Sequence, residues 1–139
     1  MKRGLVEWDP SELSRETLAG RVARCQAVLA EQELDAAVFY TSVAQPGLVR
    51  YLVHFLPYWN EGVVVLPREG DPTLFVALSN RVFPWIKGSS TLQDVRASRN
   101  LGADAARLLA ERRAAALVRG VQGRRRRRAG DDPARRDGR

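Results

Sequence analysis

All ten aromatic residues of this 139-residue chain lie at or before Trp85, and the last 28 residues contain eleven arginines. A folded core needs large apolar side chains, and an arginine-rich segment has almost nothing to bury. Residues 1–111 carry 12 basic and 13 acidic side chains, a net charge of −1, whereas residues 112–139 carry 11 Arg and 3 Asp, a net charge of +8. We therefore divide the chain into a folded domain, residues 1–111, and an Arg-rich low-complexity tail, residues 112–139.

The length of 139 residues allows one modest domain and excludes a two-domain enzyme. No apolar run approaches the roughly 20 residues of a membrane-spanning helix, and the first residues lack the apolar centre of a signal peptide. A single Cys excludes an intramolecular disulfide, and one Cys with one His does not supply the ligands of a structural zinc site. We expect a cytoplasmic protein without a membrane partner.

The first periodic segment begins at Ser14 or Thr17, either of which can cap a helix, and it reaches about Gln32. Its apolar residues recur at helical spacing and form one stripe, made of Leu18, Val22, Cys25 and Leu29. Cys25 lies inside this stripe, so we interpret it as a small core residue and not as a reactive thiol. The segment is predicted to be an amphipathic helix.

Short apolar segments rich in strand-forming residues follow this helix. They span residues 35–41, 62–67, 73–78 and 92–95, and a loop with Pro46-Gly47 follows the first of them. The glycine and proline within residues 68–72 predict a hairpin between the second and third strands. Helices are expected over residues 79–86 and from Gly102 to about Glu111. This alternation predicts an α/β domain in which a mixed β-sheet is flanked by helices.

No spacing in the chain matches a phosphate-binding glycine loop or a common hydrolase motif. His54 has no evident partner, and a lone His is more often structural or solvated than catalytic. Residues 55–61 bring three aromatics, an amide and a carboxylate together ahead of a strand. This segment fits either core packing or a surface that faces a ligand or partner. Residues 81–85 are interpreted as a helix that packs its aromatics on the sheet.

Several segments, taken in order, resemble the N-terminal domain of the creatinase, prolidase and aminopeptidase P family. The matching segments are residues 21–34, 35–38, 49–55, 62–67 and 72–76. Family members have an Arg-containing helix that ends in a Leu-Asp-Ala strand start, an Asn-x-Arg-Tyr-Leu-x-Gly-Phe turn and two hydrophobic strands. Here Arg50-Tyr51-Leu52 and Phe55 match the turn, whereas Gly47-Leu48-Val49 replaces the usual Asn. His54 replaces the usual Gly, which accepts a positive φ more readily.

The resemblance spans about residues 15–111 and implies a ribonuclease-H-like α/β fold. In such enzymes the chemistry belongs to a larger C-terminal pita-bread domain. Two Asp, one His and two Glu there hold two metal ions for hydrolysis of the bond before proline, or, in creatinase, His assists hydrolysis without metal. None of those motifs follows Glu111, so we expect no catalytic residue, metal ligand or cofactor here, and no peptidase activity from this chain alone.

The family's N-terminal domain forms subunit contacts and influences substrate choice. The resemblance therefore implies a non-catalytic role in substrate selection and dimerisation, with a second copy or the missing catalytic domain as the partner. The residues that we expect to face a substrate or partner are Arg50, His54, Tyr58 and Trp59.

The tail, residues 112–139, is expected to be disordered beyond about Val121. Its mixture of Arg, Ala, Gly and Pro, without Lys, is what GC-rich DNA yields in a shifted frame, which favours a truncated family member. A solvated tail without function is one alternative. A nucleic-acid-binding protein that acts through this tail is another, although the tail has no aromatic residue to stack on bases. A third is an active metallopeptidase whose catalytic half is a separate chain.

Overall fold

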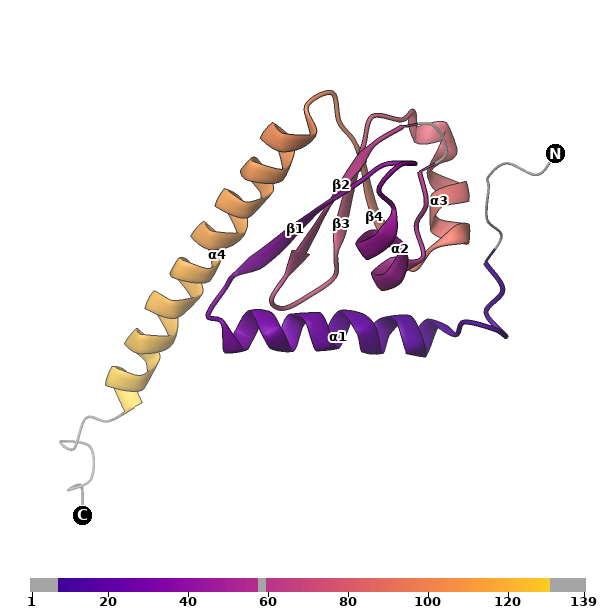
Figure 1. Cartoon of the computed structure of the whole chain (residues 1–139). Helices are drawn as coiled ribbons and strands as arrows, with labels where there is room; N and C mark the ends of the chain where they lie inside the picture. Colours follow the sequence, from indigo (N-terminus) through magenta and orange to yellow (C-terminus); the bar gives the residue numbers. More distant parts are fainter. Residues whose placement is uncertain (1–7, 58–59, 131–139) are drawn as a thin grey trace, which may run out of the picture. The chain divides into compact units, whose positions relative to one another are not determined.

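The computed structural model describes residues 8–57 and 60–130, and within residues 116–130 it describes the backbone. Helices and strands are interspersed along the chain, with β2 and β3 consecutive (Figure 1). They are α1 (Arg15–Glu31), β1 (Ala36–Thr41), α2 (Gly47–Val53), β2 (Gly62–Pro67), β3 (Thr73–Val76), the 3-10 helix η1 (Asn80–Val82), α3 (Phe83–Ser89), β4 (Asp94–Ala97) and α4 (Leu101–Gly130). The predicted α/β class, with a mixed sheet and flanking helices, is confirmed.

The four strands form one sheet in the order β1-β2-β3-β4. β1 pairs with β2 and β2 with β3 in antiparallel register, whereas β3 and β4 are parallel. A parallel pair needs a crossover connection, and η1 and α3 supply it. The predicted hairpin between β2 and β3 is confirmed, and its turn contains Gly70 at a φ of +96°. Gly62 begins β2 at a close approach, because a Cβ there would lie 3.1 Å from the Phe75 carbonyl oxygen.

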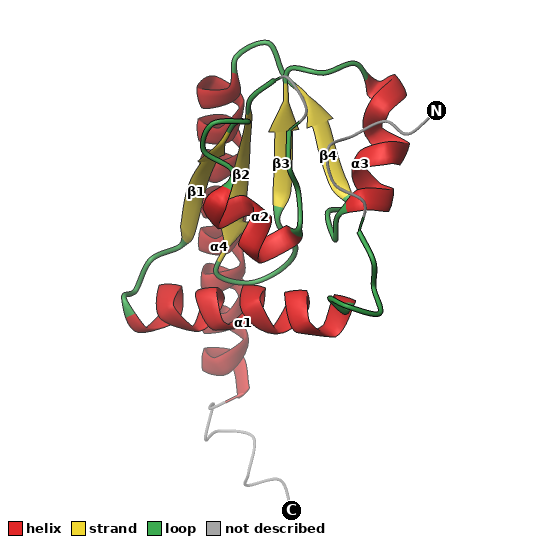
Figure 2. Ribbon diagram, turned by 45° about the vertical axis from the view of Figure 1, so that its right-hand side comes forward, coloured by secondary structure: helices red, strands yellow, loops and turns green. Residues whose placement is uncertain are grey.

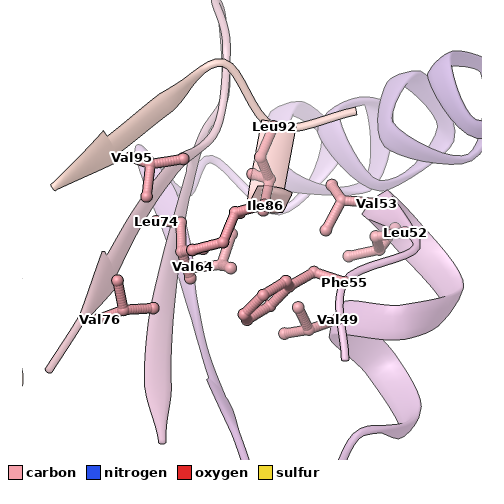
Figure 3. Close-up of a cluster of buried hydrophobic side chains, with 10 residues drawn as sticks. All are labelled: Val49, Leu52, Val53, Phe55, Val64, Leu74, Val76, Ile86, Leu92 and Val95. Carbon is pink, nitrogen blue, oxygen red and sulfur yellow. The ribbon is translucent and has the colours of Figure 1, made fainter. Parts of the chain in front are cut away.

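One face of the sheet carries the main hydrophobic core, which Figure 3 shows in close-up. α2 lies over this face and α3 lies beside β4 (Figure 2). The buried cluster consists of Val49, Leu52, Val53, Phe55, Val64, Leu74, Val76, Ile86, Leu92 and Val95. Cys25 is partly buried and packs against this cluster, as do the aromatic side chains of Phe83 and Trp85. The core-packing interpretation of residues 81–85 is therefore confirmed.

Local hydrogen bonds fix both ends of α1. Ser14 is the N-cap, since its Oγ accepts a hydrogen bond of 3.1 Å from the Thr17 backbone N–H. At the other end, the Glu33 N–H donates to the Ala30 carbonyl and the Leu34 N–H donates to the Leu29 carbonyl. This pair of bonds is a Schellman motif, which requires a left-handed residue after the helix. Glu33 occupies that position, at a φ of +55°.

The structure has a helix, α2, where the sequence analysis predicts a loop and a turn. It has seven residues and buries Val49, Leu52 and Val53, the i, i+3 and i+4 positions of one face. A helix this short has no stable existence in isolation and depends on the packing of its apolar face. Pro46 and Gly47 signal a turn in the sequence, and two turns of helix are too few to show a clear period.

The helix α4 is a second difference, because it continues past Glu111 and past Val121 to Gly130. Asn100 starts it by accepting the Ala103 N–H at 3.0 Å through Oδ1. Ala, Arg and Leu dominate the sequence that follows, and these residues rank among the best helix formers. The backbone of residues 122–130 is helical, whereas the sequence analysis expects disorder beyond about Val121. The chain divides into two compact units, Met1–Ala106 and Arg107–Arg139.

Glu33→Gly is expected to raise the free energy of unfolding by about 1 kcal/mol, because glycine adopts the left-handed conformation without a Cβ penalty. Urea denaturation monitored by circular dichroism measures the change. Glu33→Gln is the matched control, since it removes the charge and keeps the strained backbone, and little change is expected.

Gly70→Ala is expected to lower the stability of the domain, because the φ of Gly70 is +96° and no neighbouring atom lies within 4 Å of the added Cβ. Equal stability of all four proteins would contradict this explanation.

Candidate functional site

The outer side of α2 carries the first candidate surface. Leu48 is 65% exposed and Tyr51 is 50% exposed, three residues apart, and Arg50 is exposed between them. We call Leu48, Arg50 and Tyr51 the α2 surface. Since residues three apart are neighbours on a helix, Leu48 and Tyr51 share one side of α2.

Arg21 of α1 holds Tyr51 in place. Its Nη1 donates a hydrogen bond of 2.9 Å to the Tyr51 carbonyl oxygen, and its guanidinium carbon lies 4.3 Å from the centroid of the Tyr51 ring. The cation and the ring attract each other, and this contact joins α1 to α2. Tyr51 is therefore a positioned aromatic side chain, although half of it faces solvent.

Arg50 differs from Arg21 in its surroundings. Across residues 8–57 and 60–115, no hydrogen bond or ion pair engages its guanidinium group. A guanidinium group next to apolar surface is suited to binding a carboxylate through two parallel hydrogen bonds. The α2 surface thus combines apolar area with one cation, which fits contact with a protein or peptide better than catalysis.

His54 ends α2 in the left-handed conformation, with φ of 59° and ψ of 25°. Its Nδ1 lies 3.1 Å from the Ser89 carbonyl oxygen, so the Nδ1–H tautomer donates a hydrogen bond to the end of α3. The imidazole centroid lies 5.9 Å from that of Trp8. The described partners of the His54 ring therefore belong to α3 and to the segment before α1, not to the α2 surface.

Trp8 is a contact residue that the sequence analysis does not identify. Its Nε1–H donates to the Leu13 carbonyl at 2.7 Å, and the Arg15 guanidinium carbon lies 4.4 Å from the centroid of its ring. Together with the His54 contact, these interactions fasten the segment before α1 to the end of α2. An isolated Trp ahead of a helix has no spacing signal, so the pattern could not reveal this role.

Tyr58 and Trp59 lie outside the described residues, but the residues on both sides of them are placed. Phe55 is fully buried in the core, so this aromatic serves packing. Asn60 donates from Nδ2 to the Ala77 carbonyl at 2.9 Å, and the Tyr40 hydroxyl donates to Glu61 Oε2 at 2.7 Å. Phe55 therefore lies in the buried core, whereas Asn60 and Glu61 lie at the end of the sheet where β1 ends and β2 begins.

A buried hydroxyl lies at the same end of the sheet. Thr41 is opposite Gly62 in the register and is fully buried. Its Oγ1 has no hydrogen-bond partner among the residues that the structure describes. A buried hydroxyl without a hydrogen bond is destabilising. This end of the sheet therefore contributes less to stability than the apolar core around Phe55.

In the described part of the chain, no three His, Cys, Asp or Glu side chains lie close enough together to hold a metal ion. No helix in that part is long and apolar enough to span a bilayer. The chain matches no protein-family model, and no curated protein matches it.

His54→Ala is expected to be less stable than His54→Gly by about 1 kcal/mol. Both substitutions remove the imidazole and its contacts with Ser89 and Trp8. They differ in that alanine keeps a Cβ at a φ near +59°, whereas glycine does not. Chemical denaturation of the two variants isolates this backbone effect. Identical midpoints and slopes would show that the left-handed conformation at this position carries no strain.

Glu61→Gln is expected to lower the pKa of Tyr40. The hydrogen bond to the Glu61 carboxylate raises the Tyr40 pKa above its ordinary value of 10.0, and a hydrogen bond with Ser42 opposes it. A raised pKa in the folded state stabilises the protein below pH 10, and this stabilisation is lost as the pH rises through the raised value. Titration of phenolate absorbance measures the change, and Tyr40→Phe identifies the transition. An unchanged titration in Glu61→Gln would contradict the assignment.

Proposed function

We propose that residues 1–111 form a non-catalytic domain of the creatinase, prolidase and aminopeptidase P type. Its role is to contact a second subunit or a catalytic domain and to influence which substrate is accepted. Hydrolysis of the bond before proline then belongs to a pita-bread catalytic domain and not to the residues of this domain. The ribonuclease-H-like arrangement of that family's N-terminal domain is part of the same proposal.

The observation that carries the proposal is the left-handed backbone at His54. The family has Gly before the Phe of its Arg-Tyr-Leu-x-Gly-Phe turn, and glycine is the residue that adopts this conformation without strain. The resemblance rests on side-chain identities, whereas the φ of 59° is a property of the backbone. The two agree on the same position, which supports the alignment of residues 49–55 with that turn.

The order of the elements adds support. The Arg-containing helix α1 ends just before Leu34-Asp35-Ala36, where β1 begins. The Arg-Tyr-Leu segment lies in α2, and the two hydrophobic strands are β2 and β3. Most of the segments on which the resemblance rests therefore lie in regular elements, and residues 54–55 follow the end of α2.

The α2 surface supplies a place for the proposed contact. Leu48 and Tyr51 are large apolar side chains that are at least half exposed, and apolar side chains grouped at a surface can mark sites of protein association. Arg50 adds a cation that can pair with a carboxylate of the partner or of a peptide substrate. Tyr58 and Trp59 remain proposed members of the substrate-facing edge.

Sedimentation velocity of the full chain over a wide range of concentration tests the subunit contact. Self-association is expected, and Leu48→Glu is expected to shift the equilibrium to monomer, because it places a charge within an apolar contact. Val28→Glu on α1 is the matched control, since Val28 is 53% exposed and lies outside the α2 surface. An equal effect of both substitutions would assign the association to nonspecific apolar contact.

A separately produced catalytic domain of the aminopeptidase P type tests the substrate-selection role. Adding the full chain is expected to change KM for Xaa-Pro peptides, and Arg50→Gln is expected to reduce that effect. The chain by itself is expected to show no metal-dependent hydrolysis. A chain that stays monomeric at every concentration and neither binds nor alters the catalytic domain would contradict the proposed function.

A further inference from the structure

The C-terminal part of α4 has an unusual charge distribution. Residues 112–130 contain eight Arg and no acidic residue, and their backbone is helical throughout. We call residues 112–130 the arginine helix. At 1.5 Å per residue the backbone extends about 28 Å, and the Arg positions along it are 112–113, 119 and 124–128.

The helical backbone distributes these charges around its axis. Arg124 to Arg128 are five consecutive residues, and successive residues of an α-helix are separated by about 100°. The four steps between them add up to about 400°, more than one full turn, so every side of this turn carries a cationic position. A turn of this kind has no apolar side with which to pack on a protein core.

The same sequence argues against a membrane surface as the partner. A helix that lies in a membrane interface needs an apolar face opposite its basic face. The last large apolar residues of the arginine helix are Leu117, Val118 and Val121, and none follows among residues 122–130. The most basic part of the helix therefore lacks the side that would enter the acyl chains.

Single-stranded nucleic acid is also a poor match. Proteins that bind single strands combine basic residues with aromatic side chains on which bases stack. The arginine helix contains no aromatic residue, since the last one in the chain is Trp85. The partner that best fits the arginine helix is therefore one whose phosphates are closely spaced in a regular array.

We infer that the arginine helix binds the phosphodiester backbone of double-helical nucleic acid without sequence preference. All eight cations of the helix are Arg, whose planar group binds phosphate through two parallel hydrogen bonds. Residues 1–111 have a net charge of −1 and contribute no overall attraction, so the affinity resides in the arginine helix. Binding of this type releases counterions and weakens steeply as salt concentration rises.

Fluorescence anisotropy with labelled 20-base-pair duplexes of unrelated sequence tests the inference on the full chain. Contact with about six phosphates predicts a slope near −5 in a plot of log K against log salt, and a loss of affinity of about 10³-fold between 50 and 200 mM salt. Duplex DNA and duplex RNA are measured in parallel, because they share the phosphate array and differ in groove shape. Matching single strands are expected to bind more weakly.

The test variant changes Arg124, Arg125, Arg126 and Arg127 to Gln, which preserves helix propensity and removes four charges. It is expected to lose more than about tenfold in affinity and to flatten the salt slope by about 4. The control changes four exposed cations of the other unit to Gln, namely Arg24, Arg81, Lys87 and Arg99. It has the same net charge as the test variant and is expected to keep the affinity and the slope.

Circular dichroism and thermal melting of both variants show whether each one folds. Three results would overturn the inference: equal affinity of the test variant and the unmodified chain, an equal loss in the control, or tighter binding of single strands than of duplexes. Binding to vesicles with anionic headgroups is measured in parallel. If the chain binds these vesicles as tightly as it binds duplexes, the arginine helix is assigned to membranes instead. A variant in which the four Arg become Lys should keep the salt slope, because the charge is unchanged, and should lose part of the affinity, because Lys cannot form the two parallel hydrogen bonds.

Discussion

The packing of α2 and Phe55 against one face of the sheet is the interaction on which the rest of this domain depends. Phe55 is fully buried, and it lies among side chains from α2, from the strands and from Ile86 of α3 (Figure 3). Burial of a side chain of this size contributes about 2 to 3 kcal/mol, a large part of the stability of a small domain. The seven residues of α2 have too few internal hydrogen bonds to form a helix without this contact.

The left-handed residue at position 54 makes that packing geometrically feasible. It ends α2 and redirects the chain, so that Phe55 enters the core directly after the helix. A side chain at this position carries a backbone penalty, and the contacts of the His54 ring with Ser89 and Trp8 offset it. His54 therefore connects α2, α3 and the segment before α1.

The chain combines two physical characters that do not require each other. The domain is nearly neutral and folds by burying apolar area, whereas the arginine helix is strongly basic and has little to bury. A contact domain and a polyanion-binding helix are consequently separate proposals with separate tests. Association through the α2 surface depends on apolar area, and binding through the arginine helix depends on salt.

Local patterning in the sequence was sufficient for α1 with its Ser14 cap, the four strand segments and the hairpin with Gly70, because periodicity, capping and turn chemistry act over a few residues. It also separated the neutral domain from the basic tail. The sequence patterns did not predict α2, because a short helix depends on its core contacts. They also predicted too early an end for α4, because a long helix rich in Arg and Ala lacks an apolar period. Tertiary packing alone brought Trp8 to His54 and Arg21 to Tyr51, because these contacts join residues that are far apart in the chain.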